Sequence, residues 1–129
     1  MNREIKFRGY AVEEMINSQW IEDAFGVEDI EYTNGKISTY LLTPYGDYEV
    51  IKKSVGQYTG LKDKNRVEIY EGDIVKFDNN NFEVYQHPSG DWQAGGYSIW
   101  ENISEDGIEN KWEVIGNIYE NPELLEVEQ

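Results

Sequence analysis

The sequence predicts a mainly β protein with a small helical content, folded as a small barrel or sandwich. Many short runs alternate apolar and polar residues, and turn-forming residues separate these runs every 8–12 positions. Aromatic residues make up 14% of the 129-residue chain and can fill a core although only 39% of the residues are hydrophobic. We expect two parts, a β-rich subdomain over residues 1–56 and a second part over 57–129.

The beginning of the first part allows two interpretations. Glu4–Arg8 alternates polar and apolar residues and predicts a half-buried strand. Residues 12–24 then carry apolar side chains at helical spacing, at Val12, Met15, Ile16 and Trp20. This spacing favours a short helix, and two short strands around Met15-Ile16 and Trp20-Ile21 are the open alternative.

The rest of the first part predicts a run of antiparallel strands. Asp29–Thr33 alternates, and Asn34-Gly35 is typical of a type I′ hairpin turn, which requires positive φ at both central residues. Ile37–Leu42 is the expected return strand. A turn at Pro44–Asp47 then precedes a strand over Tyr48–Ile51.

The second part begins with the richest local pattern, Gln57–Val75. We expect a strand, a turn at Lys64–Arg66, a strand over Val67–Tyr70, and a reversal at Glu71–Asp73, where Gly72 can adopt positive φ. Strands at 74–77 and 82–85 should enclose a hairpin loop at 78–81. Trp92–Trp100 is broken by Gly95-Gly96, which suggests a bulge or sharp bend.

The C-terminal region predicts one more strand and a short helix. Residues 101–111 are acidic and typical of a loop. Trp112–Tyr119 should form the last strand, bent at Gly116. Asn121 followed by Pro122 fits the cap and first position of a short helix over 122–125.

Charge and composition exclude several classes of function. The net charge of −15 disfavours direct binding to nucleic acids and to anionic membranes. It is uneven, because residues 51–77 hold six cations against four acids, whereas 78–129 hold twelve acids and only Lys111. With no cysteine, no apolar run of about 20 residues and no signal-peptide pattern, we expect a cytoplasmic protein.

The sequence offers no convincing catalytic, cofactor-binding or metal-binding residues. His87 is the only histidine and sits in an expected turn. Asp63–Asn65 begins like a calcium loop, but Val67 and Glu68 occupy positions that need an oxygen ligand and a glycine. Glu71 and Asp73 resemble an acid/base pair, although at a turn such residues more often cap backbone groups.

A partner surface is predicted on the aromatic residues near the expected second-part strands. These are Tyr58, Tyr70, Trp92, Tyr97 and Trp100. Aromatic grooves flanked by acids bind extended peptides in several small β domains. The competing interpretation, which we weigh more heavily, places these rings in the core.

Three blocks of the chain together resemble the YopX family of phage and prophage proteins. They are Arg3–Arg8, Gln57–Asn65 with Glu68–Val75, and Val114–Leu125. The chain departs from the family pattern at Gly9–Ala11 and at Asn65-Arg66, where the family usually has Asn-Gly. The resemblance implies that 57–129 form an SH3-like β-barrel and that the protein acts in a bacterial host cell. It implies no activity, cofactor or catalytic residue.

The leading functional hypothesis is a non-enzymatic accessory protein that binds a protein partner or self-associates, including as a homo-oligomer. The alternative is an acidic DNA mimic that inhibits a host nucleic-acid-binding protein, motivated by the −15 charge. An enzyme using carboxylates and a metal ranks last.

Overall fold

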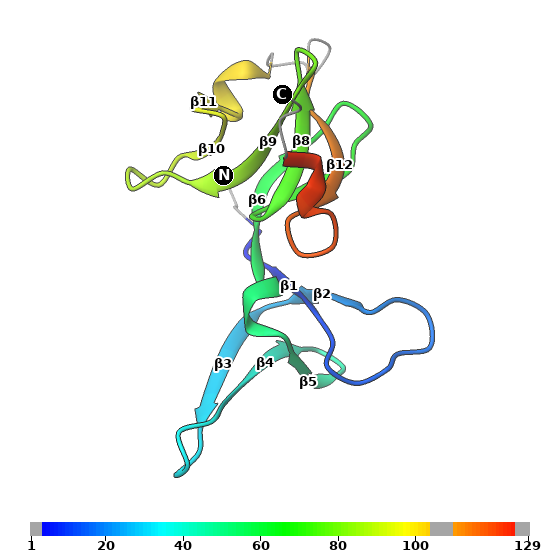
Figure 1. Ribbon diagram of the computed structural model, residues 1–129, viewed down its shortest axis with the longest axis vertical. Coiled ribbons are helices and arrows are strands. Elements are labelled where there is room, and N and C mark those ends of the chain that lie inside the picture. The colour runs from blue at the N-terminus through cyan, green and yellow to red at the C-terminus, as the bar shows by residue number, and fades with distance from the viewer. Residues whose placement is uncertain (1–3, 104–109, 126–129) are drawn as a thin grey trace. The chain divides into compact units, whose positions relative to one another are not determined.

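The computed structural model describes residues 4–103 and 110–125, which form β-strands and short 3-10 helices (Figure 1). The prediction of a mainly β protein with several antiparallel sheets is confirmed. The chain divides into two compact units, Met1–Tyr58 and Thr59–Gln129.

Unit 1 contains a three-stranded antiparallel sheet in the order β3-β4-β5. The bounds are β1 Phe7–Tyr10, β2 Trp20–Ala24, β3 Gly26–Glu31, β4 Ile37–Thr43, β5 Gly46–Val50 and the 3-10 helix η1 Lys52–Ser54. β1 pairs with β2 and with the start of β6 (Gly56–Lys62). Ala24, Leu41 and Val50 form the core, with Phe7, Ile21 and Val55 packed against them.

The helix expected over residues 12–24 is wrong. Residues 12–19 form an irregular loop and Trp20–Ala24 is a strand, so only the Trp20-Ile21 part of the two-strand alternative is found. Ile16 is 100% exposed and Val12 51% exposed, so the apolar stripe of the proposed helix buries nothing. A helix this short needs such burial, because propensity alone is marginal below about 12–15 residues.

The hairpin between β3 and β4 forms as predicted, but its turn is of another type. Gly35 has φ 88°, whereas Asn34 is not among the residues with positive φ. Gly35 N–H donates to Tyr32 C=O, and Tyr32 N–H donates to Lys36 C=O. These bonds define a three-residue loop in which glycine closes a type I turn. Glu31 therefore lies opposite Ile37, one residue away from the register of the predicted I′ turn, which would place Glu31 opposite Ser38.

Unit 2 is built on a five-stranded antiparallel sheet in the order β11-β10-β9-β8-β12. The bounds are β7 Glu68–Tyr70, β8 Asp73–Phe77, β9 Asn80–Gln86, β10 Trp92–Ala94, β11 Tyr97–Ser98 and β12 Glu113–Asn117, with 3-10 helices η2 Trp100–Asn102 and η3 Pro122–Leu125. The end of β6 lies beside β7. Within the described ranges these pairings do not close into a barrel, so the SH3-like barrel stays a prediction.

Two turns of unit 2 differ in detail from the expectation. Gly95 and Gly96 have φ 63° and 85° and make a hairpin turn between β10 and β11, so of the two expected alternatives the sharp bend is found and the bulge within one strand is not. Asp78 and Asn79 also have positive φ and form the two-residue turn between β8 and β9. Of the expected loop at 101–111, the first two residues belong to η2, and 104–109 lie outside the described residues.

The C-terminal strand bends as predicted, with an irregular register between Val114 and Gly116. The short helix at 122–125 is confirmed as a 3-10 helix. The predicted cap is different, because the Asn121 side chain accepts from Asn117 N–H at 3.2 Å, and its backbone C=O accepts from Leu124 N–H.

The core of unit 2 is centred on Trp112, which is 0% exposed. Its ring stacks on Phe77 at a centroid distance of 4.2 Å and an interplanar angle of 23°. The other buried members are Ile69, Val75, Val84, Trp92, Ala94 and Ile99. Trp112 Nε1 is buried and has no hydrogen-bond partner among the described residues, so this indole serves as a hydrophobic side chain.

Asp63 organises the turn that the sequence placed at Lys64–Arg66. Its Oδ1 accepts from Asn65 N–H at 2.8 Å and from Val67 N–H at 2.9 Å. Its Oδ2 accepts from Val114 N–H in β12 at 2.8 Å. One buried carboxylate therefore fixes the β6–β7 turn and ties it to β12.

Replacing Arg66 with glycine is expected to raise the free energy of unfolding by about 1 kcal/mol. Arg66 has φ 68°, a conformation that glycine adopts without steric cost. Urea denaturation measures the change, and Arg66→Ala is the control, because it removes the same exposed side chain and keeps the Cβ. Equal stabilisation by both variants would contradict the backbone explanation.

Candidate binding cleft in unit 1

The structure separates the five aromatic residues that the sequence singled out. Tyr58, Tyr70 and Trp92 are buried, with 6%, 2% and 5% of their surface exposed. Tyr97 and Trp100 are 50% and 64% exposed, and both lie in the β11–η2 segment of unit 2. The first three therefore contribute to packing, and only the last two offer ring surface to a partner.

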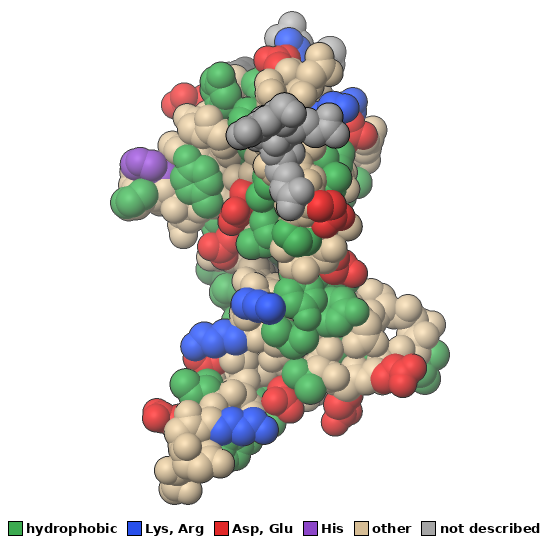
Figure 2. Space-filling model, in the orientation of Figure 1, with side chains coloured by type: hydrophobic (Ala, Val, Ile, Leu, Met, Phe, Trp, Pro, Cys, Tyr) green, Lys and Arg blue, Asp and Glu red, His purple; other side chains and the backbone are tan. Residues whose placement is uncertain are grey.

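A cleft in unit 1 has a larger aromatic lining, which sequence reasoning missed. Its volume is about 330 Å³. It is lined by Met15, Trp20, Ile21, Glu22, Asp23, Thr43, Pro44, Tyr45 and Tyr48. Figure 2 shows hydrophobic side chains gathered near β1 and β2 on the visible face of unit 1. We call these nine residues the aromatic cleft.

The walls of the aromatic cleft come from three segments that are distant in the sequence. Trp20–Asp23 lie on β2, Thr43–Tyr48 surround the β4–β5 turn, and Met15 lies on the loop before β2. Tyr45 sits in that turn and is 89% exposed. The β4–β5 turn, and not packing in the core, positions Tyr45. Its ring can therefore contact a ligand without leaving the hydrophobic core.

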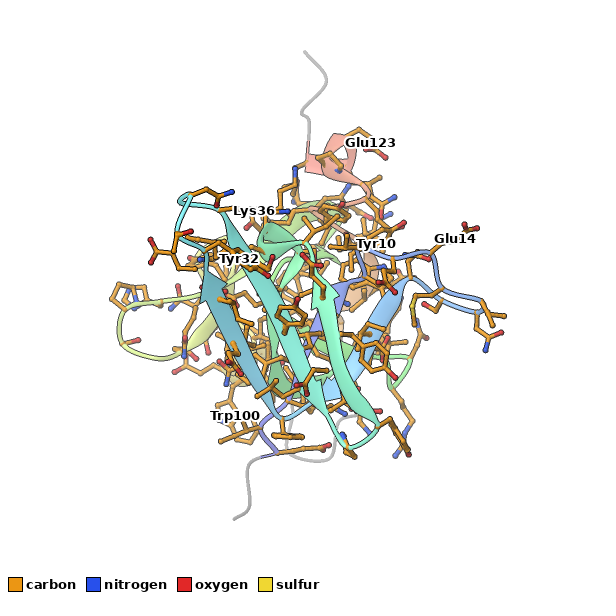
Figure 3. The ribbon with its side chains drawn as sticks, turned by 90° about the horizontal axis from the view of Figure 1, so that it is seen from below. Tyr10, Glu14, Tyr32, Lys36, Trp100 and Glu123 are labelled. Carbon is orange, nitrogen blue, oxygen red and sulfur yellow. The ribbon has the colours of Figure 1, made fainter. Side chains whose placement is uncertain are left out.

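Gln19 holds the loop that carries Met15. Its Oε1 accepts from Met15 N–H at 2.7 Å, and its Nε2 donates to Glu13 C=O at 3.0 Å and to Ala11 C=O at 3.2 Å. The backbone of Ala11 also donates to Gln19 C=O at 2.8 Å. In a helix, these backbone groups would bond to one another. In the loop, the side chain and backbone of Gln19 provide their hydrogen-bond partners instead. In Figure 3, Glu14 marks this loop.

Replacing Gln19 with glutamate is expected to loosen residues 12–18 at a cost of about 1–2 kcal/mol of local stability. The glutamate carboxylate can still accept from Met15 N–H. In place of the Nε2 donor, however, it puts a second oxygen beside the C=O groups of Ala11 and Glu13, so both hydrogen bonds are lost and the oxygens repel one another. Faster amide hydrogen exchange at Met15 measures the effect. The control is Asn17→Ala in the same exposed loop, which should leave that exchange rate unchanged.

Trp20 is fixed by two neighbours on β1. Tyr10 meets it edge-on at a centroid distance of 5.5 Å and an angle of 87°. The Arg8 guanidinium lies over the indole at 4.8 Å from the ring centroid. Arg8 thus shows that this indole accepts a cation on its face, as expected for tryptophan.

The surroundings of the aromatic cleft are acidic. A smaller hollow of about 150 Å³ adjoins it through Met15 and Tyr48, and Glu13, Asp47 and Glu49 line that hollow. With Glu22 and Asp23, five carboxylates line the two depressions, and no Lys or Arg does. Lys6 Nζ lies 3.5 Å from Asp23 Oδ1 and compensates one of these charges.

Tyr40, which also lines the smaller hollow, titrates abnormally. A hydrogen bond with Tyr32 is the main cause, and the negative charges of Glu49 and Glu13 add to it, so that the pKa of Tyr40 lies above its ordinary value of 10.0. Because folding raises the pKa of Tyr40, the protonated Tyr40 side chain contributes to the free energy of unfolding at pH values below 10. This contribution is lost as the pH rises through the pKa of Tyr40 in the folded protein.

Replacing Tyr32 with phenylalanine is expected to lower the pKa of Tyr40 toward 10.0, because the hydrogen bond is the largest cause of the shift. The phenolate absorbance during an alkaline titration measures it, with Tyr40→Phe identifying the transition. An unchanged Tyr40 transition in the Tyr32→Phe variant would contradict the assignment.

The remaining candidates for chemistry have structural surroundings. His87 is exposed in a turn, where its Nδ1 accepts from Ser89 N–H at 3.1 Å. Asp73 is 1% exposed and accepts from Tyr70 N–H at 2.8 Å, as a turn cap does, whereas Glu71 is exposed. Over residues 4–103 and 110–125, no three His, Cys, Asp or Glu side chains gather as a metal site would require. No helix in those ranges is long and apolar enough to cross a bilayer.

The fold is that of a small antiparallel β protein, and its first unit carries a cleft lined by aromatic side chains. The chain belongs to the YopX protein family, whose sequence profile matches residues 6–126. It is also similar to the crystal structure of protein EF1440 from Enterococcus faecalis, with 26% identity and a TM-score of 0.54, over 97% of this chain and 100% of the other. No curated protein matches it.

Proposed function

We propose that the protein is a non-enzymatic binding module that takes a positively charged, partly apolar segment of a partner protein into the aromatic cleft. The observation that carries the proposal is the combination of apolar walls with five carboxylates, two in the lining of the cleft and three in that of the adjoining hollow, and no cation in either lining. The family resemblance adds a phage or prophage setting, in which the partner is a phage or bacterial host protein.

The chemistry of the cleft favours a cationic side chain next to an apolar one. Exposed rings such as Tyr45 attract cations through their faces, and Glu22 adds a carboxylate within the same lining. Complementary charge would mainly speed association, so binding should weaken as salt is added. A lining of this kind repels acidic segments, which supplies specificity.

The test uses the pentapeptide Ac-Arg-Leu-Pro-Arg-Leu-NH2 as the probe, measured by calorimetry at two salt concentrations. Tyr45→Ala and Glu22→Gln should each weaken binding about five- to tenfold. Both residues are surface positions, and Tyr45 is 89% exposed, so neither change should alter the fold. The matched control is Tyr97→Ala on the other exposed aromatic surface, which should bind normally. The glutamate counterpart of the peptide should not bind.

The outcomes separate the two surfaces. Loss of binding in Tyr97→Ala with normal binding in Tyr45→Ala would place the site at Tyr97 and Trp100 and overturn the cleft assignment. Failure of the arginine peptide to bind the unmodified protein more tightly than the glutamate peptide would overturn the charge preference. The DNA-mimic hypothesis stays a prediction from the net charge of −15. On the visible face of each unit in Figure 2, other side chains separate the acidic ones.

A further inference from the structure

Among the residues that the structure describes, β3 is an edge strand, and its outer backbone groups have no partner there. It pairs with β4 alone, in the register Gly26↔Leu42 to Glu31↔Ile37, and it runs along one side of the sheet in Figure 3. Tyr32 bonds to Lys36 at the hairpin end, and bonded pairs alternate along an antiparallel ladder. The N–H and C=O groups of Val27, Asp29 and Glu31 therefore point away from β4.

This edge lacks most of the features that protect edge strands from further pairing. Such strands are normally short, bulged, or protected by proline, by charged side chains (above all lysine) or by a covering segment, and of these features β3 has, within the described part of the chain, only its acidic side chains. Residues 27–31 are all exposed and contain no proline, no lysine and no register irregularity. Val27 and Ile30 are 40% and 39% exposed, so both faces of the strand offer apolar contact.

The charges on β3 decide which chain can occupy the edge. Glu28, Asp29 and Glu31 are consecutive or nearly consecutive carboxylates. A hydrogen bond from Lys52, followed by one from Thr39, lowers the pKa of Asp29 and keeps it ionised. In an antiparallel pairing of two copies centred on Asp29, Asp29 would face Asp29 and Val27 would face Glu31. Like charges directly opposite each other destabilise a strand pair.

We propose that β3 accepts an additional strand from an extended, lysine- or arginine-rich segment of a partner protein. The backbone of Val27, Asp29 and Glu31 supplies the pairing. Lys52 Nζ lies 2.9 Å from Asp29 Oδ2 and compensates that charge, so Glu28 and Glu31 are the carboxylates that select a cationic segment over a second copy of this chain. This site is formed by backbone groups of β3 and does not depend on the aromatic cleft or on the function proposed for it.

The experiment uses the peptide Ac-Lys-Val-Lys-Val-Lys-Val-Lys-NH2 and the same peptide N-methylated at every residue. The two carry the same charges, but only the first can donate backbone hydrogen bonds. Val27→Pro removes an outward N–H without touching the β3–β4 ladder, and Val27→Ala is its control, because it trims the side chain and keeps the N–H. Circular dichroism checks that each variant is folded. Each protein in the series also carries Tyr45→Ala, which weakens binding at the cleft and leaves β3 intact.

In the Tyr45→Ala background, in which the cleft binds a cationic, partly apolar peptide more weakly, Val27→Pro is expected to reduce the remaining affinity at least tenfold and Val27→Ala less than threefold. The N-methylated peptide should bind at least tenfold more weakly to the Tyr45→Ala protein, a result that requires no change in β3. Equal binding of both peptides would overturn strand addition. Equal binding of a neutral Thr-Val repeat would overturn the charge selection, and a dimer through β3 in sedimentation equilibrium would overturn the choice of occupant.

Discussion

Replacing Trp112 with alanine is expected to lower the free energy of unfolding of unit 2 by about 3–5 kcal/mol. The side chain is 0% exposed and stacks on Phe77, so its removal deletes the largest buried apolar group and leaves a cavity between the sheet strands. Domains of this size are typically stable by about 5–15 kcal/mol, so the loss is a large fraction of the total. The midpoint of urea denaturation and the near-ultraviolet circular dichroism should both change.

Trp112→Phe separates packing from hydrogen bonding. Because Nε1 has no partner among the described residues, phenylalanine sacrifices no hydrogen bond and keeps a ring against Phe77. We expect a cost of about 1–2 kcal/mol, which reflects the smaller volume alone. If Trp112→Phe is as damaging as Trp112→Ala, the indole nitrogen makes an essential bond and the interpretation as a purely apolar residue is incorrect.

The second large effect is expected for Asp63→Ala, at about 2–4 kcal/mol. The carboxylate accepts from the backbone N–H groups of Asn65, Val67 and Val114, and alanine leaves all three without this acceptor. Hydrogen bonds to a charged group contribute about 1.5–3 kcal/mol each, but they are not additive when one group makes several of them. The effect should appear in urea denaturation and as faster exchange of the Val114 amide.

Two further variants test whether the carboxylate acts through both oxygens. Asp63→Asn keeps one acceptor oxygen and should lose about half as much stability. Lys64→Ala removes the neighbouring exposed side chain, whose pair with Glu113 at 3.5 Å lies at the surface, and should change stability by less than about 0.5 kcal/mol. An Asp63→Ala cost no larger than that of Lys64→Ala would show that the turn forms without its carboxylate.

The sequence predicted the strands and reversals well because local rules determine them. Turn signals before and between them identified β4, β8 and β9, and glycine marked the reversals at Gly35 and Gly72, both of which have φ 88°. The sequence identified Asp63 as a turn residue and also tested it as a calcium ligand, but it did not predict the hydrogen bond to β12. The donor at Val114 is 51 residues away in the chain, so the turn pattern alone did not reveal it.

The features that failed depend on contacts across the sequence. The helix over 12–24 was inferred from apolar spacing, but no surface covers Ile16, and Gln19 satisfies the loop backbone instead. Met15, β2 and the β4–β5 turn together line the aromatic cleft. The periodicity of apolar residues within one segment does not indicate which other segments that segment will contact in the fold. Gln19 directly before β2 is a common sequence pattern, so it could not have predicted that its side chain holds the loop over residues 12–19.

The tip of the β3–β4 hairpin offers a place for chemical labelling. A Cβ at Gly35 would meet nothing within 4 Å, and Thr33 beside it is exposed. Because the chain has no cysteine, Thr33→Cys would introduce a single thiol. A fluorophore attached there would report the rotational slowing that accompanies capture of a large ligand, while the nine cleft side chains keep their native chemistry.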